Sequence, residues 1–132
     1  MVSRRTAEWR LGRSDRVRVL IEDPDAQWFH DFERYRCSGV EVAVCTGPDA
    51  AAPDCPHLKG RRCELWEAAD AVVFALPRDE PTGRLVLKTG RRDHPGKPIV
   101  FDLTAEAQPG ARTEDVIDGR VAAVREALRR LS

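Results

Sequence analysis

The sequence predicts a single doubly wound α/β domain with a five-stranded parallel sheet. Short β-branched runs alternate with helical segments, a continuous apolar run at 71–76 is closed by Pro77, and an amphipathic segment lies near the end of the chain. Alternating strands and helices form a parallel sheet covered on both faces, and its central strand is apolar throughout. With 132 residues the chain is long enough for one domain with a buried core.

The first strand and helix are expected at 17–21 and 26–38. The β-branched run at 17–21 is followed by two acids and a proline, residues that commonly end a strand. Residues 26–38 place four aromatic side chains on one helical face, and Gly39 can end that helix. The four are Trp28, Phe29, Phe32 and Tyr35.

The middle of the chain predicts two further strands. Residues 40–45 form the second strand, and the proline-rich stretch 46–56 is a loop. A short helix at 63–69 follows, since Gly60 and two arginines interrupt the segment before it. The apolar run at 71–76 is the third strand and the one expected to be most deeply buried.

The last third predicts a helix at 82–93, a fourth strand at 99–103 and a brief fifth strand at 115–118. A closing helix follows, because apolar residues recur there at helical spacing. These are Val121, Val124, Leu128 and Leu131. Residues 1–16 carry five arginines without a clean period and are expected to be a flexible basic tail, leaving 17–132 as the domain.

The balance of charged residues bears on which kinds of partner the chain can bind. The 22 basic and 22 acidic residues balance, so no global field favours nucleic acid or an anionic membrane. The chain shows no apolar run of spanning length and no signal-peptide pattern, which predicts a cytoplasmic protein. We expect a protein partner, with a homodimer as one form of it.

Three segments carry a family resemblance. VRVLIEDPD, ADAVVFALP and HPGKPIVFDLTAEA resemble, in order and spacing, the receiver domain of bacterial response regulators over residues 17–131. The resemblance implies a CheY-like, flavodoxin-like fold. It also implies a magnesium-binding acidic pair at Glu22 and Asp23 and a hydroxyl position at Thr104.

The chain departs from that family where the chemistry would occur. The position of the phospho-accepting aspartate falls on Ala75, which has no nucleophilic carboxylate, and no lysine is available around residues 116–119. Losing one carboxylate should leave magnesium weakly bound at best. Asp102 is either a substitute carboxylate or a hydrogen-bonded structural acid, and we favour the latter. The resemblance therefore implies a pseudo-receiver.

A second set of residues has no counterpart in the family. Cys45, Cys55, His57 and Cys63 lie in the loop from 45 to 63 and offer the donors of a Cys₃His site. Zinc or an iron–sulfur cluster is the leading expectation for this set. A Cys55–Cys63 disulfide acting as a redox switch and simple burial of the thiols are the alternatives.

The sequence thus predicts a non-catalytic signalling or regulatory pseudo-receiver that acts through protein contacts, with a metal or redox site in its cysteine loop. One alternative is an interaction module with purely structural cysteines. Another is an enzyme that uses a cleft at Glu22, Asp23 and Thr104, because ligands of open α/β sheets bind at the carboxyl ends of the strands.

Overall fold

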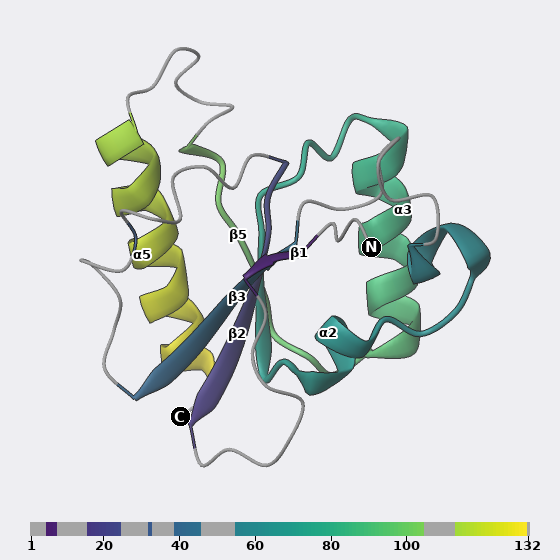
Figure 1. Cartoon of the computed structure of the whole chain (residues 1–132), viewed down its shortest axis with the longest axis horizontal. Helices are drawn as coiled ribbons and strands as arrows, with labels where there is room; N and C mark the ends of the chain where they lie inside the picture. The colour runs from purple at the N-terminus through teal and green to yellow at the C-terminus, as the bar shows by residue number, and fades with distance from the viewer. Residues whose placement is uncertain are drawn as a thin grey trace.

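The computed structural model describes residues 5–7, 16–24, 32, 39–45, 55–104 and 113–131. Within these ranges a sheet lies between α5 (Thr113–Arg130) on one face and α2 (Glu64–Ala68) with α3 (Pro81–Asp93) on the other (Figure 1). The fold is α/β and compatible with the doubly wound class expected from the sequence. No helix in the described ranges is both long and apolar enough to cross a membrane.

Four parallel strands form the centre of the sheet. They are β2 (Val17–Glu22), β3 (Val40–Cys45), β4 (Ala71–Phe74) and β5 (Ile99–Phe101), in the order β3-β2-β4-β5. Apart from their exact ends, these are the first four strands predicted from the sequence. Their order is that of the first four strands of a flavodoxin-like sheet.

The fifth strand of the sheet is not the one predicted. β1 (Arg5–Ala7) pairs antiparallel with β3 at the far edge, so these three residues are not part of a flexible tail. Residues 115–118, predicted as a parallel strand, belong instead to α5. Ile117 lies four and seven residues before Val121 and Val124, and all three are buried, so the helical period of the closing helix extends back through this segment.

Close contacts at two glycines place α3 against α2 and against the loop that follows β4. A Cβ atom on Gly90 would overlap the ring of the buried Trp66, and one on Gly83 would overlap the carbonyl oxygen of Pro77. Glycine weakens a helix by about 1 kcal/mol relative to alanine. Here the two glycines instead permit close packing, and the helix predicted at 82–93 forms as α3.

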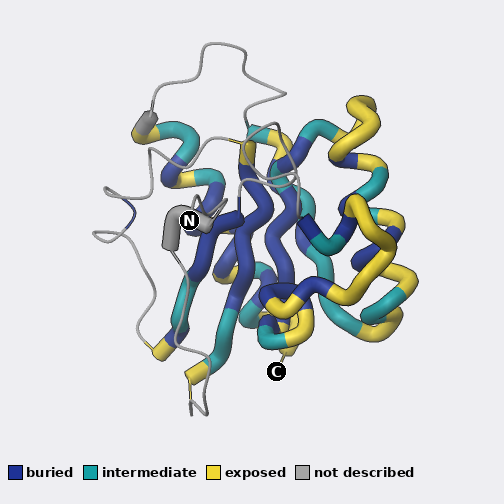
Figure 2. The backbone as a smooth tube through the Cα atoms, turned by 45° about the vertical axis from the view of Figure 1, so that its right-hand side comes forward, coloured by how far each residue is buried: buried dark blue, intermediate teal, exposed yellow. Residues whose placement is uncertain are grey.

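The parallel strands are largely buried (Figure 2), and the alternation of their side chains divides the core in two. Val19, Ile21 and Val73 pack toward α5, whereas Leu20, Val72 and Phe74 pack toward α2 and α3. Such alternation is the expected consequence of the two-residue period of a strand. Phe32, helical and buried on the α5 side, is the one described residue of the helix predicted at 26–38. The rest of that helix, and residues 46–54 of the predicted loop, lie outside the described residues.

Candidate functional site

The carboxyl ends of the parallel strands bring the receiver-like positions to one edge of the sheet. Glu22 ends β2 and faces Phe74 in register, and Phe74 faces Phe101. Ala75 follows β4 and donates its N–H to the carbonyl of Glu22 at 2.7 Å. Asp102 follows β5 and donates its N–H to the carbonyl of Phe74 at 3.1 Å. The backbone thus brings Glu22, Ala75 and Asp102 to the same end of the sheet.

Arg120 of α5 lies between two of the acids at this edge. Its Nε donates to Oδ2 of Asp23 at 2.8 Å, and its terminal nitrogen Nη1 donates to Oδ2 of Asp102 at 2.6 Å. The three side chains are almost fully buried. Burial lowers the pKa of Arg120, but Asp23 and Asp102 outweigh that effect and leave the pKa raised. The guanidinium is therefore a fixed positive charge between the two carboxylates. Asp23, Asp102 and the neighbouring Thr104 are called the acidic pocket below.

Thr104 completes the network around Asp102. Its backbone N–H and its hydroxyl both donate to Oδ1 of Asp102, at 3.0 and 2.6 Å. α5 approaches closely here, because a Cβ atom on Gly119 would overlap Oγ1 of Thr104. Asp102 therefore accepts hydrogen bonds on both oxygens, as expected for a structural acid at the strand end.

The two members of the predicted acidic pair do not converge. Asp23 is directed to Arg120 on the α5 face, whereas Oε1 of Glu22 accepts a hydrogen bond from Nε1 of Trp66 on the α2 face at 3.0 Å. Both carboxylates are buried. Since α2 and α5 cover opposite faces of the sheet, these contacts separate the two carboxylates that a shared magnesium ion would need.

Arg120 is a residue of this site that the sequence analysis does not predict. A signal for it exists, because Arg120 lies three residues after Ile117 and four before Val124, within the apolar stripe of the closing helix. Burial of a charged side chain is unfavourable unless it is paired, so an arginine in such a stripe is expected to have an acidic partner. Its partners are two acids from separate strand ends, which no local pattern reveals.

The cysteine loop forms a separate region beside α3. Cys45 ends β3, Cys55 precedes the short 3₁₀ helix η1 (Pro56–Lys59), and Cys63 precedes α2; all three are buried thiols, and none is in a disulfide within the described part of the chain. His57, within η1, is also buried, and its Nδ1 forms a hydrogen bond with Oγ1 of Thr89 in α3.

These four side chains do not form a set of metal ligands in the structure. Across the described ranges, which include all four, no group of three or more His, Cys, Asp or Glu side chains is arranged to hold a metal ion. Their use as zinc or iron–sulfur ligands stays a prediction from the sequence.

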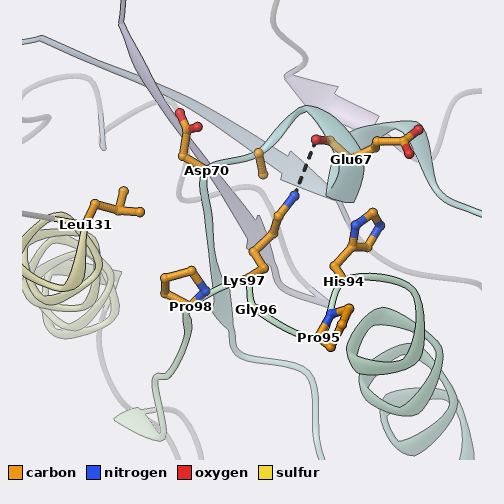
Figure 3. Close-up of a pocket in the computed structure, with 9 residues that line it drawn as sticks. Glu67, Asp70, His94, Pro95, Gly96, Lys97, Pro98 and Leu131 are labelled. Carbon is orange, nitrogen blue, oxygen red and sulfur yellow. Dashed lines mark hydrogen bonds between the residues drawn. The ribbon is translucent and has the colours of Figure 1, made fainter.

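A pocket of about 560 Å³ opens at the opposite end of the strands, where β4 and β5 begin (Figure 3). Lys97 extends into it and donates to the backbone carbonyl of Trp66 and, at 3.3 Å, to that of Glu67. These are carbonyls of α2, so the lysine stabilises this short helix near its C-terminus. Burial lowers the pKa of Lys97, partly offset by Asp70 and Glu67.

His94 forms another wall of this pocket. Its ring stacks on Trp66 at a centroid distance of 6.3 Å, and its Nε2 atom is buried without a hydrogen-bond partner among the described residues. Burial lowers the pKa of His94, and Lys97 and Arg62 add to the effect. The pocket therefore combines an amine already bound to protein carbonyls with a histidine that favours its neutral form.

Comparison of the chain with protein-family models, with curated proteins and with solved structures finds no significant match. The receiver resemblance accordingly depends on the residues quoted above and on the order of the four parallel strands.

Proposed function

We propose that this protein is a non-catalytic regulatory module that acts through contacts with a partner protein, on a receiver-like scaffold whose acidic pocket is closed by its own Arg120. One observation carries the proposal: the buried guanidinium binds Asp23 and Asp102 together. In a receiver that accepts a phosphoryl group, a metal ion and the incoming phosphoryl group would occupy this position.

Arg120 competes directly with a divalent cation. Magnesium requires several oxygen ligands in near-octahedral geometry and gives up its water reluctantly. Oδ2 of Asp23 and Oδ2 of Asp102 are already hydrogen-bonded to the guanidinium, and Glu22 is directed to the other face. A cation would have to displace the buried guanidinium from both carboxylates, which is unfavourable because the guanidinium would then be a buried charge without a partner.

The edge of the sheet also lacks a nucleophile at the receiver position. Ala75 follows β4 where the acceptor aspartate would be, and its methyl group cannot form an acyl phosphate. The geometry likewise favours the module over an enzyme that uses Glu22, Asp23 and Thr104. Each of these side chains forms a hydrogen bond with a different protein group: Glu22 with Trp66, Asp23 with Arg120 and Thr104 with Asp102.

Incubation with acetyl phosphate and magnesium tests the proposal, with intact-protein mass spectrometry as the readout. We expect no phosphoryl adduct on the wild-type chain. The matched variant Ala75→Asp restores the acceptor alone and should also stay unmodified, because Arg120 still fills the pocket. An adduct on the wild type would contradict the non-catalytic assignment. An adduct on the variant would contradict the closure of the pocket by Arg120.

A further inference from the structure

The outer face of α3 carries a stripe of basic side chains. Arg84, Lys88 and Arg91 lie at i, i+4 and i+7, so they share one face of the helix, and all three are exposed. No aspartate or glutamate occurs in α3 before Asp93 at its last position. The stripe therefore has no acidic residue interleaved with it.

Arg78 extends the stripe from the loop after β4. Its Cζ lies 4.7 Å from the ring centroid of Phe101, and Cζ of Arg91 lies 5.7 Å from the same centroid. Two guanidinium groups thus share one aromatic ring on the edge strand β5. A guanidinium held on an aromatic face keeps its N–H groups available for a carboxylate, which it can bind with two parallel hydrogen bonds.

Among the described residues, no acidic side chain pairs with the basic side chains of this surface. Within the described ranges, no carboxylate forms an ion pair with Arg78, Arg84, Lys88 or Arg91, and Arg84 donates instead to the backbone carbonyl of Asp79 at 2.7 Å. Three other exposed arginines are paired with a nearby acid: Arg62 with Glu67, Arg92 with Asp93 and Arg129 with Glu126.

We infer that Arg78, Arg84, Lys88 and Arg91 form a docking surface for an acidic segment of the partner protein. This inference builds on the proposed function and names the chemistry of the partner. Three cations on successive turns of one helix and a fourth on the preceding loop match a short row of carboxylates, and the two guanidiniums at Phe101 provide an anchor.

A protein segment fits this surface better than nucleic acid. Binding to a phosphate backbone draws on many cations and on a field that extends over the molecule. This chain has balanced charge, with 22 basic and 22 acidic residues, and Asp79 and Glu80 border the stripe at the start of α3. Those two acids lie between Arg78 and Arg84 in the sequence and would repel a long polyanion that followed the surface, whereas a short acidic segment can pair with the four cations alone.

The test measures fluorescence anisotropy of a labelled peptide of alternating glutamate and glycine as the full chain is added. A lysine–glycine peptide of the same length and a single-stranded DNA of equal charge serve as comparison probes. We expect saturable binding of the acidic peptide that weakens with salt, and no binding of the basic one. The double variant Arg78→Gln, Arg91→Gln should weaken binding by roughly tenfold.

Arg125→Gln is the matched control, because Arg125 is an exposed arginine of α5 on the other face of the sheet. It should leave the affinity unchanged. Equal weakening by the control, tighter binding of the DNA, or no binding of the acidic peptide would each overturn the docking surface. None of these outcomes bears on phosphorylation, so failure here is distinguishable from failure of the proposed function. Circular dichroism confirms that each variant is folded.

Discussion

Arg120 and Asp23 form a buried ion pair, with 2.8 Å between Nε and Oδ2, across 97 residues of sequence. The pair fastens α5 to the carboxyl end of the central strand β2. Because Asp102 shares the same guanidinium, the closing helix is bound to β2 and β5 together. The stability of the fold and the state of the acidic pocket therefore depend on the same side chain.

Replacing Arg120 with methionine should destabilise the protein strongly. Asp23 and Asp102 would keep their buried positions without a positive partner, and such a loss costs about 3–5 kcal/mol of unfolding free energy. Urea denaturation followed by circular dichroism measures the change. Adding Asp23→Asn and Asp102→Asn to this variant should recover part of the loss, because the unpaired charges are then gone.

Arg125→Met provides the matched control for that substitution. Arg125 is exposed on the same helix, and a surface change of this kind stays within about 0.5 kcal/mol. If the two methionine variants lost equal stability, the ion pairs of Arg120 would not be what binds α5 to the sheet.

Gly119→Ala should destabilise the protein even though alanine is the better helix former. The new Cβ would overlap Oγ1 of Thr104 and lie 3.2 Å from Oδ2 of Asp102, and Thr104 cannot move without losing its hydrogen bond to Asp102. We expect a loss of about 1–3 kcal/mol in unfolding free energy. Gly96→Ala, with nothing within 4 Å of its Cβ, should be near neutral. A stabilising effect at Gly119 would show that α5 does not approach Thr104 this closely.

Trp66→Phe should expose the role of the indole N–H. The variant keeps an aromatic ring but removes the hydrogen bond to Oε1 of the buried Glu22, which costs about 1–3 kcal/mol when a buried acceptor loses its donor. Thermal denaturation gives the loss. In a Glu22→Gln background the same change should cost less, since the charged acceptor is absent. Identical costs in both backgrounds would indicate that only packing of the ring matters.

Stability should fall on mild acidification because of His94. Burial, Lys97 and Arg62 lower its pKa below the ordinary value of 6.5, whereas Glu67 and Asp93 oppose the shift. The unfolded chain then binds a proton at a higher pH than the folded protein does. Unfolding free energy therefore decreases as the pH falls below 6.5 and levels off below the folded pKa.

Urea denaturation at a series of pH values between about 7 and 5 measures this slope. His94→Asn should flatten it by removing the titrating ring. A slope that is unchanged in the variant would assign the effect to other groups.

The main elements of the fold were predictable because each has a local signal. The apolar run at 71–76 ends at a proline, and Ala71–Phe74 is indeed the buried strand β4. β1 has no such signal, since a short edge strand pairs through backbone groups that nearly every residue possesses. The misplaced fifth strand arose from reading residues 115–118 alone rather than in phase with Val121 and Val124.

The sequence was enough to predict where the residues of the candidate site lie in the fold, but not which way their side chains point. Glu22, Asp23 and Thr104 were expected at the carboxyl ends of the strands, and the structure places all three there. Which way each side chain turns depends on donors from distant segments, namely Trp66 for Glu22 and Arg120 for Asp23. Spacing in the sequence carries no information about such pairs.

A magnesium titration of the wild-type chain followed by amide NMR tests the central claim most directly. If Arg120 closes the acidic pocket, the amide resonances of Asp23, Asp102 and Thr104 should stay unshifted at magnesium concentrations that saturate an ordinary carboxylate site. Saturable shifts at these three residues would show that the cation enters the pocket despite the guanidinium, and would contradict the account.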